Sequence, residues 1–240
     1  MTNTEIIHAI EQRHSCRSFT GAALPEHILD ELKEYIKNDD NLILIDGVNG
    51  RVGTYGIVSG STMSIAVSGD ERTAEIMDTA STAERIVLWL TSKGIGSVWL
   101  GGTFRVSGID RHIPAVIAIG IPKAKASFID RIMRKSVSSN TRKPFDELFM
   151  AKDGDFGDFR QALEMMRLAP SACNAQPWRA YIDGDTVHFY CVTDNKYSYL
   201  DMGIALCHFS LTAGEDRLFS SDAAPTIFNG AKYITSWKKS

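Results

Sequence analysis

Cysteine is scarce in this sequence, with four residues among 240. Cys16, Cys173, Cys191 and Cys207 include no CxxC pair, the spacing that zinc sites and dithiol redox motifs use. The scattered cysteines therefore argue against a metal site or a disulfide framework. Free and mostly buried thiols are typical of a reducing compartment, so we expect a cytoplasmic protein.

Long apolar runs and a strong net charge are also missing. The longest apolar stretches, residues 86–90 and 115–119, are far shorter than the roughly 20 residues that span a bilayer. No basic segment followed by an apolar one opens the chain, so we expect no secretory signal and no membrane partner. A net charge of −3 argues against nucleic acid as a partner but leaves a small anionic ligand open.

Motifs that define several large enzyme classes are absent as well. The sequence contains no GxxxxGK[ST], no HExxH and no GxSxG. These absences exclude P-loop nucleotide hydrolases, zinc peptidases of the HExxH type and α/β-hydrolases, because the chemistry of each class depends on those residues.

The composition is that of a globular protein, with 44% hydrophobic and 23% charged residues. Apolar residues at steps of three and four predict helices that begin with Thr4 as a cap and near residues 25, 76, 158 and 199. Short β-prone runs predict strands at residues 42–45, 54–59, 63–68, 97–100, 115–120 and 232–237, with a hairpin that turns at residues 183–185. Because strict βαβ alternation is missing, the pattern favours an α+β fold.

A segment without periodicity separates two runs of such elements. Residues 122–142 are rich in Lys, Arg, Ser and Asn, which is typical of a connection that crosses the surface. We therefore expect an N-terminal half over residues 1–124, a connection over residues 125–152 and a C-terminal half over residues 153–240.

Two segments carry the residue types of a ligand site. Residues 13–17, RHSCR, place two guanidiniums and a hydroxyl in one loop, which suits a phosphate, although such a cluster can also be a solvated charged loop. Residues 169–178, APSACNAQPW, concentrate proline, serine and side-chain amides before a strand. This second segment faces a ligand or is a structural turn that satisfies its own backbone.

A third segment, residues 94–102, ends in the pair Gly101-Gly102. Glycines without a Cβ let the backbone approach a flat ligand and donate N–H groups to it, and they also suit a plain turn. Each of the three segments is weak evidence when it is taken alone.

Taken together, these segments resemble the nitroreductase family of FMN-dependent oxidoreductases. Residues 13–19, RHSCRSF, are similar to the family's phosphate-binding signature R-[RH]-S-x-[RK]-x-[FY], and residues 169–178 to its APSxxNxQPW loop. Residues 94–102 and 115–122 resemble the strands beside the flavin, and residues 141–144 a basic R-x-P segment. The resemblance implies a nitroreductase-like fold, with a central, mostly antiparallel sheet flanked by helices, and FMN as the cofactor.

The order of these segments departs from the family. The APSxxNxQPW loop ordinarily follows soon after the N-terminal signature, whereas here it follows about 150 residues later. In the family the two segments come from different subunits of a dimer, so one chain that carries both implies two half-repeats joined as a pseudo-dimer, similar to the tandem-repeat branch of nitroreductases. Residues 199–205 are then the counterpart of residues 78–83, and the chain holds one FMN and needs no partner subunit.

The resemblance also implies roles for individual residues. Arg13, Ser15 and Arg142 would hold the phosphate with help from His14, while Arg17 would lie near the ribityl chain or the pyrimidine edge. Ser171 and Asn174 would contact the ring, and Gly101 or Gly102 would offer an N–H group. The full set of cofactor-binding residues is Arg13, His14, Ser15, Arg17, Gly101, Gly102, Arg142, Pro170, Ser171, Asn174 and Gln176.

The function that the resemblance implies is a ping-pong transfer of electrons from NADH or NADPH, through FMN, to a nitroaromatic, a quinone or a similar small acceptor. The chemistry would belong to the flavin, so no protein acid or nucleophile is expected. Two alternatives stay open: a flavin-binding protein with little turnover that serves storage, sensing or partner binding, and a reductive enzyme that does not use nicotinamide.

Overall fold

Two helices open the chain, and both are amphipathic. The computed structural model describes residues 1–46, 50–124, 141–214, 218–220 and 224–239. Helix α1 (Asn3–Gln12) begins after Thr2, whose side chain accepts a hydrogen bond from the Glu5 N–H while Glu5 accepts one from the Thr2 N–H. This reciprocal capping box makes Thr2 the cap, so the predicted cap at Thr4 is wrong by two residues. Helix α2 (Glu26–Ile36) follows Pro25 as predicted.

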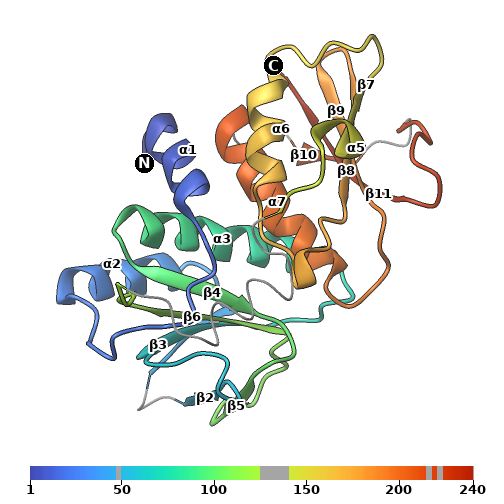
Figure 1. The fold of residues 1–240 in the computed structure, drawn as a ribbon. Coiled ribbons are helices and arrows are strands. Elements are labelled where there is room, and N and C mark those ends of the chain that lie inside the picture. The colour runs from blue at the N-terminus through green and yellow to red at the C-terminus, as the bar shows by residue number, and fades with distance from the viewer. Residues whose placement is uncertain (47–49, 125–140, 215–217, 221–223, 240) are drawn as a thin grey trace.

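The N-terminal half forms one antiparallel sheet with the strand order β1-β3-β6-β4. Its strands are β1 (Leu42–Ile45), β3 (Met63–Val67), β4 (Gly96–Leu100) and β6 (Ala115–Gly120). All of β6 is buried, as its continuous apolar run predicted. Helix α3 (Ile76–Ser92) packs against this sheet (Figure 1).

A small ribbon replaces one predicted strand. Strands β2 (Arg51–Gly53) and β5 (Arg105–Ser107) pair with each other below the sheet, whereas residues 54–58 form a turn. The turn contains Tyr55 at φ 50° and Gly56 at φ 78°, and the Thr54 hydroxyl donates to the Val58 carbonyl. Left-handed backbone is incompatible with a strand, so the predicted strand at residues 54–59 is wrong.

The C-terminal half has its own sheet, with the order β10-β11-β9-β8-β7. Its strands are β7 (Phe149–Ala151), β8 (Trp178–Asp183), β9 (Thr186–Cys191), β10 (Leu218–Phe219) and β11 (Lys232–Lys238). Strands β8 and β9 form the predicted hairpin, and only β7, which runs parallel to β8, breaks the antiparallel pattern of the described strands. The α+β fold is confirmed, but the expected central sheet is divided into two sheets, one in each half.

The expected connection over residues 125–152 lies outside the described residues as far as residue 140. From Phe145 onward the chain already belongs to the C-terminal half, because helix α5 (Phe145–Leu148) leads directly into β7, which pairs with β8. The rings of Phe145 in α5 and Phe149 in β7 pack edge to face, with their centroids 4.9 Å apart. The C-terminal half therefore begins several residues before the expected boundary at residue 153.

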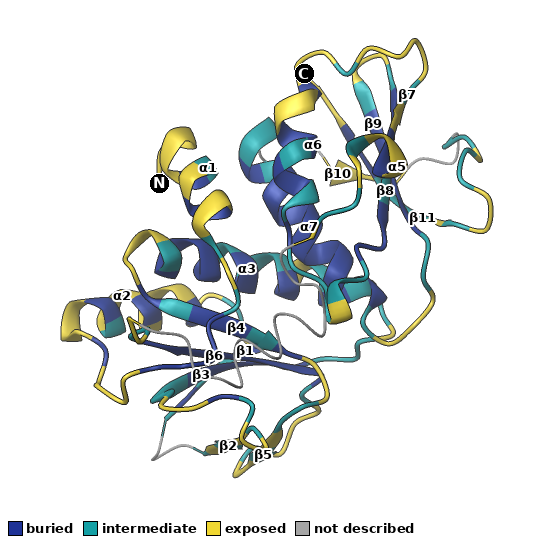
Figure 2. Cartoon of the chain, viewed as in Figure 1, coloured by how far each residue is buried: buried dark blue, intermediate teal, exposed yellow. Residues whose placement is uncertain are grey.

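Helices α3 and α7 (Ser198–Ala213) lie side by side at the centre of the molecule (Figure 1). Helix α7 is buried along most of its length (Figure 2), and it packs against α6 (Phe159–Arg167) as well as α3. At Gly203 the two central helices approach so closely that a Cβ would lie 2.3 Å from the Met77 carbonyl oxygen. The two halves are therefore joined by one continuous core.

Two further features follow from the packing. Cys16, Cys191 and Cys207 are buried, whereas Cys173 is exposed. Within the described part of the chain, no helix combines the length and apolar character needed to cross a bilayer.

Candidate functional site

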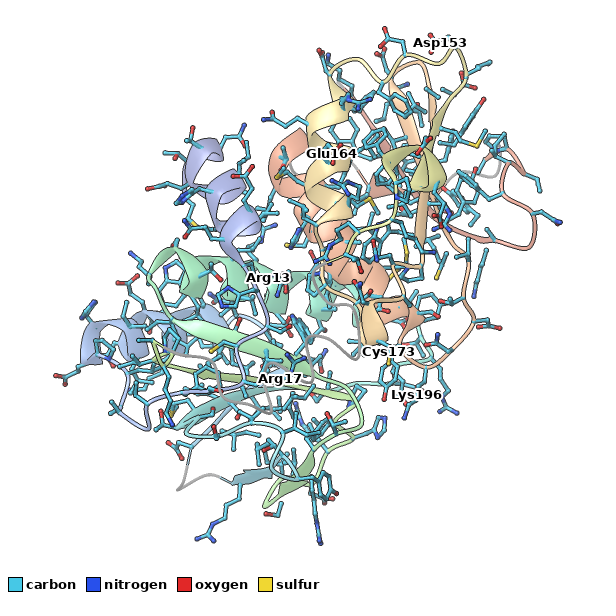
Figure 3. The ribbon with its side chains drawn as sticks, viewed as in Figure 1. Arg13, Arg17, Asp153, Glu164, Cys173 and Lys196 are labelled. Carbon is cyan, nitrogen blue, oxygen red and sulfur yellow. The ribbon has the colours of Figure 1, made fainter. Side chains whose placement is uncertain are left out.

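Both halves line one pocket, which lies where the end of α1, the end of β4, the loop before β8 and the start of α7 meet. Its volume is about 200 Å³, so its occupant is a small molecule or a part of one. In Figure 3 the labelled side chains Arg13, Arg17 and Cys173 lie at this junction of the halves. Eight of the predicted site residues line the pocket: Arg13, Ser15, Arg17, Gly101, Arg142, Pro170, Ser171 and Asn174.

The segment after α1 is extended, and this conformation determines which of its side chains face the pocket. The Cys16 N–H donates to the Ser97 carbonyl at 2.8 Å, which ties the segment to the edge strand β4. Alternate side chains of an extended chain point to opposite sides, so Ser15 and Arg17 line the pocket and Cys16 points away from it. Cys16 packs instead against Gly96, where a Cβ on the glycine would lie 3.0 Å from the Cys16 side chain. His14 is exposed, and its Nδ1 lies 3.1 Å from the Gln12 carbonyl, so its side chain does not reach the pocket.

Positive charge dominates the pocket. Arg13, Arg17 and Arg142 line it, and Asp201 is the one carboxylate among its described lining residues. Burial and the neighbouring Arg13 and Arg167 charges lower the pKa of Arg142 to about 10, and burial also lowers the pKa of Arg13. Cations that repel one another in a buried place favour an anionic ligand, because the ligand relieves both the repulsion and the desolvation.

The Arg13 side chain is deeply placed, since only 6% of it is exposed. Its Nε makes no hydrogen bond to the described residues and lies 4.0 Å from the nearest Glu84 carboxylate oxygen. A buried guanidinium N–H without an acceptor is costly by about 1–3 kcal/mol. The structure around Arg13 therefore fits a ligand with anionic oxygens, and a phosphate meets this requirement.

The loop at residues 169–178 has a strained backbone that its own side chains hold in place. Cys173, Asn174 and Gln176 adopt φ angles of 51°, 55° and 49°. Such left-handed conformations cost about 1–3 kcal/mol each in residues other than glycine. Ser171 Oγ accepts from the Gln176 N–H at 2.9 Å, and Gln176 Nε2 donates to the Asn174 carbonyl at 3.2 Å.

The same loop is braced against the segment before α5. Asn174 Nδ2 donates to the Thr141 carbonyl at 3.0 Å, Arg142 Nη1 donates to Asn174 Oδ1 at 3.3 Å, and the Lys143 N–H donates to Gln176 Oε1 at 2.8 Å. Gln176 is 3% exposed and does not line the pocket. The Gln176 side chain thus braces the loop, while Ser171 and Asn174 line the pocket.

The glycine pair after β4 is close to a tyrosine from the other half. A Cβ on Gly101 would lie 2.9 Å from Tyr197 Cε1, and one on Gly102 would lie 2.6 Å from the Tyr197 hydroxyl. Gly101 lines the pocket and Gly102 does not. A side chain at either glycine would have to displace the Tyr197 ring, and Gly102 also adopts φ 80°, a conformation that favours glycine.

Several lining residues were missed by sequence reasoning, among them Trp99, Tyr197 and Asp201. Asp201 is 5% exposed, and its Oδ1 accepts a hydrogen bond from the Ala172 N–H at 2.9 Å. Burial raises the pKa of Asp201 to about 7, although the Ala172 hydrogen bond acts in the opposite direction. One signal was available: Asp201 is the lone acid in the apolar run YLDMGIALC.

Replacement of Asp201 by asparagine is expected to remove a pH dependence of stability. The unfolded chain releases the Asp201 proton near pH 4 while the folded chain keeps it until about pH 7, so the free energy of unfolding falls as pH rises between these values. Between pH 5 and pH 8 the wild type is expected to lose about 3 kcal/mol relative to Asp201→Asn, as measured by urea unfolding. Asp110→Asn, at an exposed position, is the control and keeps the wild-type dependence. A constant difference between Asp201→Asn and the wild type at both pH values would contradict the prediction.

The comparisons with known proteins point to the same family as the motifs. The sequence matches the family model described as "Putative TM nitroreductase" over residues 5–213. A crystal structure named as a "putative nitroreductase" from Thermotoga maritima MSB8 is 25% identical with a TM-score of 0.61, and the match covers 88% of this chain and 85% of that one. No curated protein matches the sequence.

More distant structures share less of the chain. A nitroreductase family protein from Clostridium difficile 630 is 16% identical, with a TM-score of 0.41, over 59% of this chain and 94% of that one. A nitroreductase with bound FMN from Desulfitobacterium hafniense DCB-2 is 15% identical, with a TM-score of 0.37, over 52% and 93%. Each of these two structures matches little more than half of this chain. The family model, however, spans most of the chain and confirms the resemblance seen in the motifs, so the protein belongs to the nitroreductase family that this model describes.

Proposed function

We propose that the protein is an FMN-dependent oxidoreductase that takes electrons from NADH or NADPH and passes them to a small-molecule acceptor such as a nitroaromatic or a quinone. The observation that carries this proposal is the meeting of the RHSCR segment and the APSACNAQPW loop in one cationic pocket, although they lie about 150 residues apart in the chain. Membership of the nitroreductase family supports the same reading.

The residues that line the pocket divide into two groups. Arg13, Ser15 and Arg142 are proposed to hold the phosphate, because they bring charged donors and a hydroxyl to the same pocket. Arg17 is proposed to lie toward the ribityl chain or the pyrimidine edge, while Ser171, Asn174 and the Gly101 backbone lie toward the ring system. Pro170 also lines the pocket. We leave His14, Gly102 and Gln176 out of the proposed site, since none of them lines the pocket.

FMN held by these residues would supply the redox chemistry, the transfer of a hydride from the nicotinamide and of electrons to the second substrate. The protein's own residues bind the cofactor, orient it between the halves and exclude water from its buried side. A cation such as Arg17 beside the ring would stabilise negative charge that develops there. Cys173 lines the pocket and Cys16 packs beside Gly96 of β4, but we assign neither a catalytic role.

We also propose that the chain is a pseudo-dimer with one FMN site. Helices α3 and α7 form a central pair, and one sheet lies on each side of it (Figure 1). This arrangement is expected if residues 199–205 correspond to residues 78–83. Each half contributes its own segment to the pocket, so the site is complete within one chain and the monomer is the proposed functional unit. The free thiols favour a reducing compartment, and we propose the cytoplasm.

Stopped-flow reduction tests the proposed activity. Mixing the FMN-loaded protein with NADPH or NADH without oxygen is expected to bleach the flavin absorbance within seconds, and addition of an acceptor such as a quinone is expected to restore it. Dithionite reduction of the same sample is the control that shows a competent flavin. A flavin that dithionite bleaches but both nicotinamides leave oxidised would contradict the proposal and favour a flavin-binding protein with little turnover or a nicotinamide-independent enzyme.

A further inference from the structure

A fully buried acid and base lie behind the pocket, and nothing in the proposed chemistry uses them. Glu84 on α3 and His208 on α7 are both 0% exposed, and His208 Nε2 lies 2.9 Å from Glu84 Oε1. The other carboxylate oxygen, Glu84 Oε2, accepts from the Trp99 indole N–H at 2.7 Å. Arg13 Nε lies 4.0 Å from Glu84 Oε1. The pair thus contacts two residues that line the pocket, Arg13 and Trp99.

Hydrogen bonding determines how many protons this pair carries. His208 Nδ1 lies 3.0 Å from the Met165 carbonyl oxygen, which can only accept, so Nδ1 must carry a proton. The 2.9 Å contact between Nε2 and Glu84 Oε1 also needs a proton, because a lone pair facing a carboxylate lone pair would be repelled. Whether that proton is on the imidazole or on the carboxyl group, histidine and glutamate together have no net charge.

A neutral pair has a direct consequence for Arg13. Were Glu84 a bare carboxylate, its charge would cancel that of the guanidinium 4.0 Å away, and the pocket would lose much of its attraction for an anion. We propose that Glu84 and His208 are positioning residues that share one proton, hold the Trp99 indole through Glu84 Oε2 and leave the Arg13 charge available to the anionic group of the ligand. This inference rests on the proposed function in naming FMN phosphate as that group.

Three variants separate charge from packing. In Glu84→Gln the amide N–H can donate to His208 Nε2 and the amide oxygen can accept from Trp99, so the pair stays neutral. In His208→Gln the amide N–H can donate to Glu84 Oε1 in place of the shared proton, while Trp99 donates to Oε2 and Arg13 lies 4.0 Å away. We therefore expect Glu84 to be a bare carboxylate in this variant. The double variant Glu84→Gln/His208→Gln is neutral again.

The affinity of each apoprotein for FMN is measured by quenching of flavin fluorescence, with riboflavin, which lacks the phosphate, as the matched ligand. His208→Gln is expected to weaken FMN binding about tenfold or more and to leave riboflavin binding unchanged, because the new charge acts on the phosphate. Glu84→Gln and the double variant are expected to bind FMN as the wild type does. Circular dichroism checks that each variant is folded.

Three results would overturn the proposal. Tighter FMN binding in Glu84→Gln would show that Glu84 is a charged counter-ion of Arg13. This measurement tests the neutrality of the pair even if His208→Gln fails to fold. An equal loss of FMN and riboflavin binding in His208→Gln would indicate damaged packing. A double variant that binds FMN no better than His208→Gln would show that charge is not the cause.

A spectroscopic measurement keeps the pair testable if the flavin proposal itself fails. Failure of the wild type to bind either flavin would contradict the proposed function alone. In that case ¹⁵N-histidine spectra, with His208 assigned by its loss in His208→Gln, are expected to show one proton on Nδ1 and a second at Nε2 or shared with Glu84. A His208 ring with a bare Nδ1, or with no proton between Nε2 and the carboxyl group, would overturn the inference.

Discussion

Arg13→Ala and Asn174→Ala are each expected to abolish the yellow colour of the purified protein, although these residues belong to opposite halves of the chain. Arg13 is the buried cation whose Nε has no hydrogen-bond acceptor among the described residues. Loss of charged hydrogen bonds to a phosphate costs about 1.5–3 kcal/mol for each bond, so FMN affinity is expected to fall at least about tenfold. The measurement is the visible absorption spectrum, followed by titration of the apoprotein with FMN.

Asn174 acts from the other side of the pocket, where it accepts from Arg142 and donates to the Thr141 carbonyl. Alanine removes both contacts and also strains the backbone, because Asn174 adopts φ 55°. Asn174→Gly separates the two effects, since glycine accepts this conformation but has no side chain. We expect Asn174→Gly to lose flavin as Asn174→Ala does.

The matched control is Arg51→Ala, which removes an exposed arginine on β2 that does not line the pocket. It is expected to retain FMN. Flavin retention in both Arg13→Ala and Asn174→Gly would remove the basis for one site shared by the two halves. A wild-type protein that is colourless and binds no added FMN would contradict the proposed FMN-dependent function and leave only the family's fold.

Gly203→Ala is expected to destabilise the protein by about 2 kcal/mol or more, against the effect of helix propensity. Alanine is favoured over glycine inside a helix by about 1 kcal/mol, so an isolated α7 would be stabilised. In the folded protein, however, the new Cβ would lie 2.3 Å from the Met77 carbonyl oxygen and 2.8 Å from its Cα. Because these are backbone atoms of α3, the two central helices must separate, and overpacking of this kind costs about 1–3 kcal/mol, occasionally more.

The measurement is the free energy of unfolding in urea, with Gly53→Ala as the control. At Gly53 the nearest atom to a new Cβ is a carbonyl oxygen 3.9 Å away, so alanine fits there without displacement. We expect Gly53→Ala to remain within about 0.5 kcal/mol of the wild type. Stabilisation by Gly203→Ala would mean that α3 and α7 are not in direct contact at this point, and the central pairing of the halves would have to be abandoned.

Local structure was predictable where one physical signal dominated. The long helix from Ile76 and the buried strand β6 have clean periodicity or a continuous apolar run, and both form as predicted. Short elements were missed: α5 has four residues and β10 two, too few for any repeat to be visible. The turn at residues 54–58 is β-prone in composition, and its left-handed backbone at Tyr55 and Gly56 overrides that preference.

Residue types at fixed local spacing were enough to identify the family, the α+β class and eight of the residues that line the pocket. Tertiary structure alone decided which side chains meet across long separations. Glu84 and His208 are 124 residues apart, Tyr197 covers Gly101 from the opposite half, and the pKa of Asp201 is raised by burial between elements. Burial, charge cancellation and close helix contact are properties of the folded arrangement, so no local pattern could show them.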